Sequence, residues 1–543
     1  MHTLRSAGRW HSVSIPFLVL SLVLWAQLTG CAKKMSVSEA VPAPTAASSF
    51  VRMKSLAAFP MMPVANTETP RFNTEEYDPI RENTFKNAAE NPLSTFSIDV
   101  DTASYSNLRR FINMGQLPPK DAVRIEEMIN YFDYGYPEPV GEHPFSVVTE
   151  VGPCPWNAQN RLMHIGIQGK RLDYAHLKPA NLVFLIDSSG SMQNANKLPL
   201  LKTSLKLLLD ELGEKDRIAI VAYAGSAGLI LPSTPATEKA RIIEALDSLK
   251  AGGSTAGGQG IRLAYATTLD SLIPGGNNRV ILATDGDFNV GVSSTGDLVR
   301  LIEEKRKDGI YLTILGFGMG NYKDGRMEQI SNAGNGNYFY IDTIREAEKV
   351  FVREMRANLF TIAGDVKIQV EFNPARIAAW RLVGYENRLL AKEDFDDDTR
   401  DAGELGAGHT VTALYEIVSP GADAGAPTTA PLKYQETRVT AQAGQTSELM
   451  TLKFRYKPVG KATSRLIERT VTDASTVLGK TSDDFRFSAA VAGFGMLLRD
   501  SRFKGDLSWE DVRILAAGAK GADEDGDRAE MIRMVRTCQL LAK

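Results

Sequence analysis

The sequence predicts an α/β protein in which a doubly wound, Rossmann-like domain is inserted in a β-sandwich-like domain, with helical N- and C-terminal segments. Three observations predict this arrangement. Apolar, strand-like runs alternate with helical stretches in the middle of the chain, which is typical of a parallel sheet covered by helices. Short segments with alternating apolar residues stand on both sides of this middle part, as in the strands of a sandwich. The end of the chain has the apolar spacing of amphipathic helices.

The first strand of the middle part carries the most informative motif. The run Leu182–Ile186 predicts a buried strand, and an Asp-Ser-Ser-Gly-Ser loop follows it directly. In this loop, Asp187, Ser189 and Ser191 place one carboxylate and two hydroxyls at alternate positions, so all three can point at one centre. Hard oxygen ligands of this kind suit Mg²⁺ or a similar divalent cation and do not suit zinc or copper.

Two further loops are expected to reach the same place. The glycine-rich stretch 251–257 follows a predicted helix, and its Thr255 can offer a third hydroxyl. The strand Arg279–Ala283 ends in Thr-Asp-Gly, so Asp285 leaves the carboxyl end of a second buried strand. Parallel α/β sheets bind ligands outside these ends, at the point where the strand order reverses.

The other elements of this domain follow from periodicity. Leucines on one stripe predict a helix after the metal loop, at Leu198, Leu201, Leu205, Leu208 and Leu212. Further strands are predicted at Ile218–Tyr223, Leu229–Leu231, Val280–Ala283, Tyr311–Phe317 and Tyr338–Ile341.

The three loops, in this order and spacing, resemble the metal-ion-dependent adhesion site (MIDAS) of von Willebrand factor type A (VWA) domains. The resemblance implies that Asp187, Ser189, Ser191, Thr255 and Asp285 hold Mg²⁺, or alternatively Mn²⁺ or Ca²⁺. It also implies that a carboxylate of a protein or glycan partner completes the metal's coordination. The alternative is that these Ser, Thr and Asp residues only form turns and helix caps.

The flanking segments predict the sandwich. Two alternating runs precede the α/β domain, Phe145–Val151 and Arg161–Gln168. Four follow it, at Val366–Phe372, Ile377–Val383, His409–Val418 and Leu449–Tyr456. A similar insertion of an α/β unit into a sandwich is found in integrin-like adhesion proteins. The C-terminal part, Asp483–Lys543, is expected to be helical.

The start of the chain predicts export and lipid anchoring. Arg5 and Arg9 precede a short apolar run, and Leu-Thr-Gly-Cys closes it at Cys31. This ending resembles a bacterial lipobox, which implies cleavage before Cys31, lipid attachment there, and a position in the cell envelope at the outer membrane. An ordinary signal peptide or an uncleaved anchor is the alternative.

The expected parts are a signal peptide (1–30), a disordered tether (31–74), an N-terminal segment (75–140), first sandwich strands (141–178), the VWA domain (179–362), the remaining sandwich (363–480) and C-terminal helices (481–543).

The N-terminal segment is expected to be a separate unit. A strand is predicted around Phe96, Ile98 and Val100, and Asp101 is expected to cap the helix that follows it. Residues 94–106, together with Ala283–Gly291 and the C-terminal third, resemble YfbK-like bacterial lipoproteins that contain a VWA domain. The resemblance covers most of the chain after Cys31.

Composition and motifs limit the function classes. The formal net charge is −3 and no basic stripe suggests nucleic acid. No catalytic constellation stands out, so we expect a binding protein and no enzyme. A metal-dependent envelope hydrolase, and a structural protein whose metal only stiffens the fold, remain alternatives. The acidic run 394–401 is expected to be a solvated loop, with a weak calcium site as the alternative. The run 523–527 looks like a calcium loop, but its glycine is misplaced and Met534 stands where the closing glutamate should be.

Cys154 and Cys538 are the cysteines other than Cys31. An oxidising compartment favours pairing of thiols that reach each other, but free cysteines often fill core space. We expect two separate buried thiols.

Overall fold

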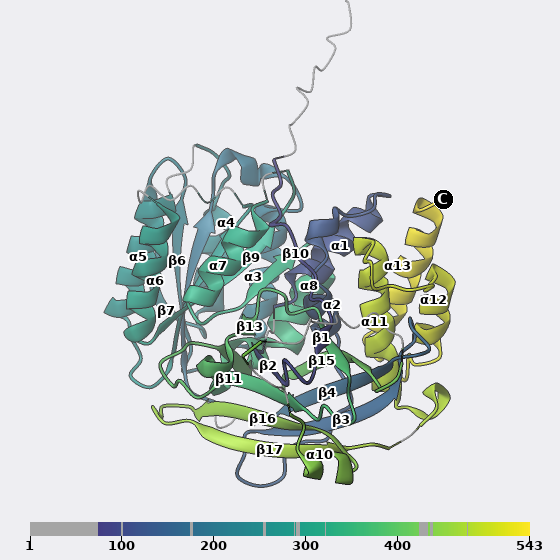
Figure 1. The fold of residues 1–543 in the computed structure, drawn as a ribbon. Helices are drawn as coiled ribbons and strands as arrows, with labels where there is room; N and C mark the ends of the chain where they lie inside the picture. The colour runs from purple at the N-terminus through teal and green to yellow at the C-terminus, as the bar shows by residue number, and fades with distance from the viewer. Residues whose placement is uncertain are drawn as a thin grey trace, which may run out of the picture. The chain divides into compact units, whose positions relative to one another are not determined.

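The computed structural model describes residues 74–98, 101–173, 177–253, 257–286, 288, 294–320, 322–422, 433–434, 438–474 and 476–543. Within this part, one mainly parallel sheet stands above two antiparallel sheets in Figure 1, and a group of helices lies beside them. Among the described residues, no helix is both long and apolar enough to span a bilayer.

The parallel sheet confirms the doubly wound fold. Its strand order is β10-β9-β8-β5-β6-β7, and only β7 runs antiparallel to its neighbour. The strands are β5 (Ala180–Asp187), β6 (Arg217–Tyr223), β7 (Ala227–Pro235), β8 (Asn277–Thr284), β9 (Ile310–Phe317) and β10 (Tyr338–Ile341). Since β8 follows β6 and β7 in the chain but pairs with β5, the strand order reverses between β5 and β8.

Helices cover both faces of this sheet because the strands are apolar on both sides. Leu182, Phe184 and Ile186 face one core, whereas Val183 and Leu185 face the other. The first core receives α3 (Leu198–Glu211), α4 (Lys239–Ser248), α8 (Ile344–Glu348), a π-helical turn (Lys349–Arg353) and α9 (Met355–Leu359). The second receives α5 (Gly257–Asp270), α6 (Thr295–Lys307) and α7 (Asp324–Ala333).

The two antiparallel sheets form the predicted sandwich. One has the order β1-β12-β15-β4-β3 and the other β13-β2-β11-β16-β17, with β14 paired to β11. Side chains from both sheets share one core, for example Met163 and Tyr415 with Ile368 and Phe454. The strands are β1 (Lys86–Asn87), β2 (Leu93–Ser97), β3 (Phe145–Pro153), β4 (Arg161–Gly169), β11 (Thr361–Phe372), β12 (Ala379–Val383), β13 (Leu389–Leu390), β14 (Gly403–Gly406), β15 (Thr410–Val418), β16 (Glu448–Pro458) and β17 (Arg465–Thr472).

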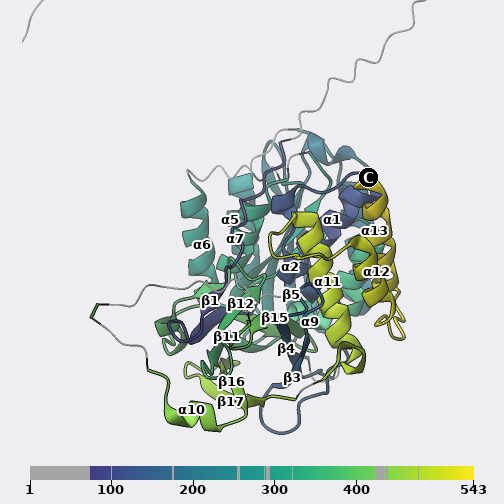
Figure 2. The same ribbon diagram turned by 45° about the vertical axis from the view of Figure 1, so that its right-hand side comes forward.

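The N-terminal segment is not the separate unit that the sequence suggested. β1 pairs with β12 and β2 pairs with β11, so this segment supplies a strand to each sandwich sheet. Its helices are α1 (Ala103–Asn113) and α2 (Ile125–Asn130). In Figure 1 they lie between β10 and the C-terminal helices α11 (Asp483–Arg499), α12 (Trp509–Ala517) and α13 (Asp527–Leu541). Figure 2 shows α2 beside α11.

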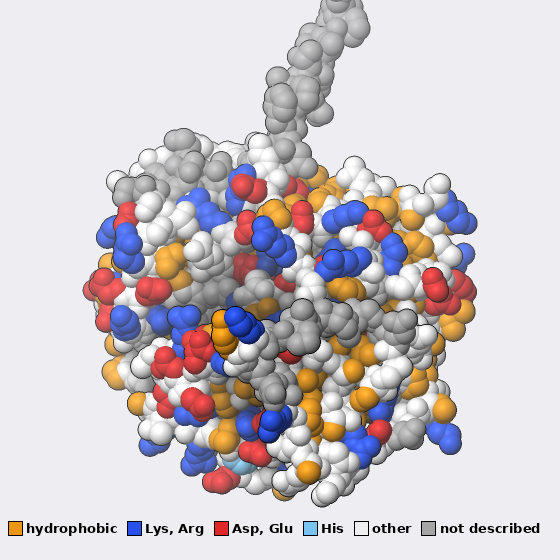
Figure 3. All heavy atoms as spheres, viewed as in Figure 1, with side chains coloured by type: hydrophobic (Ala, Val, Ile, Leu, Met, Phe, Trp, Pro, Cys, Tyr) orange, Lys and Arg blue, Asp and Glu red, His pale blue; other side chains and the backbone are white. Residues whose placement is uncertain are grey.

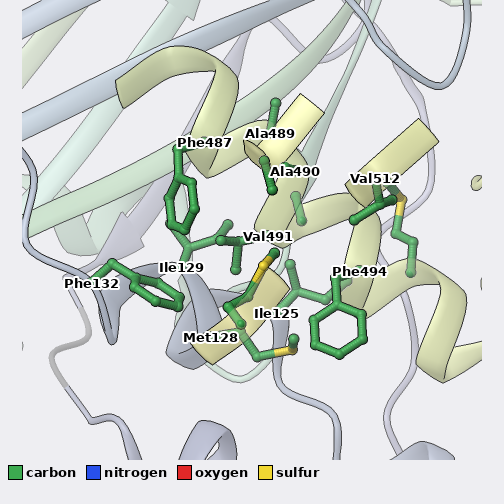
Figure 4. Close-up of a cluster of buried hydrophobic side chains, with 14 of the residues drawn as sticks. Ile125, Met128, Ile129, Phe132, Phe487, Ala489, Ala490, Val491, Phe494 and Val512 are labelled. Atoms are coloured by element: carbon green, nitrogen blue, oxygen red, sulfur yellow. The ribbon is translucent and has the colours of Figure 1, made fainter. Parts of the chain in front are cut away.

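One core joins the N-terminal segment to the C-terminal helices. Figure 4 shows Ile125, Met128 and Ile129 of α2 lying among apolar side chains of α11, including Phe487, Val491 and Phe494. Cys154 and Cys538 lie in the same core, and both are buried free thiols, as expected.

Asp101 does not cap α1, so that expectation was wrong. The residue at the N-cap is Thr102, and no side chain caps the helix there. Asp101 instead accepts a hydrogen bond of 2.8 Å from the backbone N–H of Tyr338 and forms an ion pair of 3.2 Å with Arg388. These partners lie more than 200 residues away in the chain, so local spacing could not reveal them.

Charged side chains of both signs are interspersed over the face seen in Figure 3. In the acidic run 394–401, Arg455 pairs with Asp396 and Asp398, and Arg400 pairs with Asp394. Protein cations therefore already neutralise part of this loop.

Candidate metal-binding site

The first metal loop begins where β5 ends. Asp187 is the last residue of β5, and a 3₁₀ turn, Gly190–Gln193, follows at once. The backbone fixes the loop on two sides. Ser188 N–H donates to the Tyr223 carbonyl at 2.9 Å, and Gly190 N–H donates to the Gly253 carbonyl at 3.1 Å. The loop is therefore docked against both the end of β6 and the glycine-rich second loop.

Asp187 is fully buried, and its two carboxylate oxygens differ in their hydrogen bonds with the described residues. Oδ1 accepts a hydrogen bond of 2.8 Å from the Ser189 N–H. Oδ2 makes no hydrogen bond of regular geometry with the described residues. The buried Tyr223 hydroxyl, which also makes none, is its protein neighbour and lowers the pKa of the carboxyl. Burial raises the pKa of this carboxyl to about 6, and the nearby Asp285 carboxylate adds to the rise. A buried, unpaired carboxylate oxygen is costly unless something outside the protein compensates it.

The two serine hydroxyls lie together. Ser189 Oγ and Ser191 Oγ are 2.9 Å apart, with Ser189 buried and Ser191 exposed. The loop therefore brings the two hydroxyls together beside the Asp187 carboxylate, with one of them reaching solvent.

Asp285 follows β8 and is also fully buried. Because β8 pairs directly with β5, Asp285 and Asp187 leave neighbouring strands at the carboxyl end of the sheet. Lys197 Nζ donates to Asp285 Oδ2 at 2.8 Å, and its side chain is 4% exposed. The lysine crosses closely over Gly318, where an added Cβ would lie 2.1 Å from Lys197 Cε.

Lys197 is the residue that sequence reasoning missed. It stands at the N-cap of α3, where a helix dipole disfavours a positive charge. That unfavourable position was the available signal that the ammonium has a specific partner.

Thr255 lies outside the described residues, as does Cys31. The structure thus brings together the first and third loops and the start of the second, up to Gly253.

The residues present fit a hard divalent cation. They offer two carboxylates and two hydroxyls, all oxygen ligands, and one carboxylate oxygen is buried without a hydrogen bond of regular geometry to the described residues. Asp187, Ser189, Ser191 and Asp285 would hold the ion, which would supply a positive centre for an acidic group of a ligand.

Three family models match the chain. A von Willebrand factor type A domain matches residues 181–353, and a model described as von Willebrand factor matches residues 71–164. The model of the C-terminal part of the uncharacterized protein YfbK matches residues 357–541. The three matched segments correspond to the part of the chain before the α/β domain, to the domain itself and to the part after it.

Individual proteins are similar to this chain over very different lengths. The uncharacterized protein YfbK of Escherichia coli is 44% identical over 483 residues, which is 87% of this chain and 81% of the relative. The magnesium-chelatase 60 kDa subunit of Cereibacter sphaeroides is 32% identical over 128 residues, covering 23% of this chain and 22% of that protein. A solved von Willebrand factor type A protein from Catenulispora acidiphila is 18% identical, with a TM-score of 0.40, and covers 72% of this chain and 89% of that one.

Proposed function

The chain belongs to the YfbK family and contains a von Willebrand factor type A domain, and on this basis we propose that it is a lipid-anchored cell-envelope protein that binds a partner through a divalent metal. The metal is Mg²⁺, with Mn²⁺ or Ca²⁺ as substitutes, held by Asp187, Ser189, Ser191, Thr255 and Asp285. The partner is a protein or a glycan that offers a carboxylate to the metal. The lipid is attached at Cys31.

The buried Oδ2 atom of Asp187 carries this proposal, because it makes no hydrogen bond of regular geometry with the described residues. The atom is buried at the carboxyl end of β5, beside the point where the strand order reverses. Such a place is where α/β sheets bind ligands. A divalent ion there would compensate the repulsion between Asp187 and Asp285 and would still accept an anionic group, because two carboxylates only just neutralise it.

Substitution of Asp187 tests the metal. We expect Asp187→Ala to abolish Mg²⁺ and Mn²⁺ binding in calorimetric titration, because it removes a ligand that no neighbouring carboxylate replaces at this position. The far-UV circular dichroism should stay unchanged, since Asp187 stands at the very end of β5 and is not part of the two apolar cores of the sheet. Metal binding that equals the parent's would refute the assignment. Asp247→Ala is the control, because that carboxylate forms an exposed ion pair with Lys206.

Substitution of Cys31 tests the anchor. We expect Cys31→Ser to prevent incorporation of a labelled fatty acid and to leave the precursor uncleaved. Cys154→Ser is the matched control, because that thiol is buried in the core and should not affect labelling. Label that persists in the Cys31 variant contradicts lipid attachment there.

A further inference from the structure

A polar cavity of about 170 Å³ lies where the VWA domain meets the sandwich. Its walls come from the end of β2, the loop between α7 and β10, α9, and β14 with the residues before it. In Figure 1, α7 stands above β13 and β2 in this region. Small-molecule sites favour junctions between domains, but drug-sized ones measure roughly 300–1,000 Å³. This cavity would take a smaller molecule.

One wall of the cavity carries a buried arginine that forms no direct ion pair with the described residues. Arg279 is the third residue of β8 and is 2% exposed. Its Nη1 donates to Thr313 Oγ1 at 2.6 Å, and its guanidinium lies 5.5 Å from the centre of the Tyr311 ring. Its Nε has no hydrogen-bond partner among the described residues, and the carboxylate whose charge acts on it, that of Glu404, lines the same cavity. A buried cation of this kind favours an anionic group in the cavity.

The cavity also carries a glutamate that forms no direct ion pair with the described residues. Glu404 of β14 is half-buried, and its Oε1 accepts a hydrogen bond of 3.2 Å from Asn335 Nδ2. The charges of Arg306 and Arg279 act on Glu404 without a direct contact. Burial, with the carboxylates of Asp365 and Asp401, raises its pKa to about 8. A positively charged group at Glu404 would relieve this excess of negative charge.

An amide group adds a further unused hydrogen-bonding atom. Asn358 lines the cavity and is 7% exposed. Its Nδ2 donates to the Val350 carbonyl at 2.9 Å, so the side chain is fixed, but its Oδ1 has no hydrogen-bond partner in the described part of the chain. The cavity therefore offers a cation, an anion and a fixed acceptor, which together could orient a small polar ligand.

We propose that this cavity binds a small zwitterion, a free α-amino acid or a close analogue, with its carboxylate on Arg279 and its ammonium group on Glu404. A ligand with both charges compensates both unpaired side chains, whereas an anion or a cation alone compensates only one. The site is distinct from the metal site. Arg279 and Asp285 lie six residues apart along β8, which corresponds to about 20 Å at 3.3 Å per residue.

Calorimetric titration of the full chain with single amino acids tests the proposal. At least one amino acid should bind, and the matched probes are its N-acetyl derivative and its α-carboxamide. Because each derivative lacks one charge, we expect each to bind at least tenfold more weakly. Asp187→Ala should leave amino-acid binding unchanged, which separates this site from the proposed metal site.

Two conservative variants locate the ligand. Glu404→Gln should weaken binding of the free amino acid about tenfold but leave that of the N-acetyl derivative as in the parent. Arg279→Gln should also weaken binding of the free amino acid about tenfold, but it should leave binding of the α-carboxamide as in the parent. The proposal is overturned if no amino acid binds, if blocked and free forms bind equally, or if inorganic phosphate competes as well as amino acids do. The blocked-ligand comparison on the parent chain holds even if a variant fails to fold.

Discussion

Lys197 sets the charge of the candidate metal site. Its ammonium group and the Asp285 carboxylate are both buried and 2.8 Å apart. With two aspartates and one lysine, the site carries a formal charge of −1, so a bound divalent ion would leave it at +1. A site with this excess of positive charge attracts an acidic ligand group more strongly, and it holds the metal itself less tightly.

Replacement of Lys197 should therefore separate these two effects. We expect Lys197→Met to lower the free energy of unfolding of the metal-free protein by about 1–3 kcal/mol, because it removes the buried ammonium group that pairs with the Asp285 carboxylate. We also expect it to tighten Mg²⁺ binding about tenfold, since one unit of nearby positive charge is removed. Urea denaturation in chelator and calorimetry with MgCl₂ measure the two quantities.

Lys206→Met provides the control on the same helix. Lys206 pairs with Asp247 in solvent, with 39% and 53% exposure, so its loss should change stability by less than about 1 kcal/mol. Weaker Mg²⁺ binding in the Lys197 variant would contradict the charge argument.

Among the elements, β4 and β15 share a buried polar contact that holds the N-terminal segment. Tyr136 lies against both strands, and its hydroxyl is 2.9 Å from His164 Nε2 and 2.7 Å from Thr412 Oγ1. Its ring fills the space beside Gly166, where an added Cβ would be only 2.5 Å away. Close approach of the ring thus requires glycine at this position of β4.

The burial of His164 makes this contact sensitive to pH. Burial lowers the pKa of His164 from 6.5 to about 3. The unfolded chain therefore binds this proton at a higher pH than the folded protein does. The contribution of neutral His164 to the free energy of unfolding is fully present above pH 6.5. It is lost as the pH falls toward 3, by about 1.4 kcal/mol per pH unit.

His164→Gln should remove this part of the pH dependence. Glutamine can keep a hydrogen bond to the Tyr136 hydroxyl but does not titrate, so the free energy of unfolding should fall less steeply between pH 6.5 and 4. Denaturant titrations at several pH values measure the slope. Equal slopes in variant and parent would show that His164 is not the group responsible.

Across the whole molecule, distant segments of the chain are joined by buried contacts. Arg109 of α1 pairs with Asp342 after β10, with Glu346 of α8 and with Glu530 of α13, at 2.5–2.9 Å. The apolar core of α2 and α11 adds to this connection. The chain's N-terminal segment, VWA domain and C-terminal helices therefore depend on one another for stability.

The close packing of α2 and α11 gives a direct test. An added Cβ at Gly495 of α11 would lie 2.8 Å from Ile125 Cγ1 and 3.1 Å from Met128 Sδ. Gly495→Val should therefore lower the free energy of unfolding by at least about 2 kcal/mol through overpacking. Thermal and urea denaturation measure this, and a neutral effect would contradict the close approach. Gly444→Val is the control, because no atom lies within 4 Å of its added Cβ.

Periodicity predicted the elements whose burial is regular, and tertiary contacts decided the rest. The strand at Tyr338–Ile341 was predicted with its observed bounds because all four of its residues are apolar and buried. β17 was not predicted, since only Ile467 and Val471 of its eight residues are buried. The two-residue strands β1 and β13 carry no period at all. Only their pairing with β12 and β2, respectively, defines β1 and β13 as strands.

In the candidate site, too, the local pattern predicted some residues and tertiary contacts alone revealed another. Asp187, Ser189, Ser191 and Asp285 were found because each follows a predicted strand, and strand ends in a parallel sheet converge. Lys197 could not be found this way, because its partner Asp285 lies 88 residues further along the chain. The metal itself, Thr255 and Cys31 stay predictions.

The insertion of the VWA domain has a consequence for how the chain folds. During synthesis, the parallel sheet of the VWA domain is complete once the ribosome has added residue 341. In the sandwich, β4 pairs with β15, which begins about 250 residues later in the chain. Likewise β2 pairs with β11, which begins about 270 residues later. Until then β2 and the β3–β4 hairpin present open edges. Contacts between such distant residues slow folding, and open strand edges attract other chains. Synthesis order thus makes the sandwich, and not the VWA domain, the part of the protein that most needs protection from aggregation before the chain is finished.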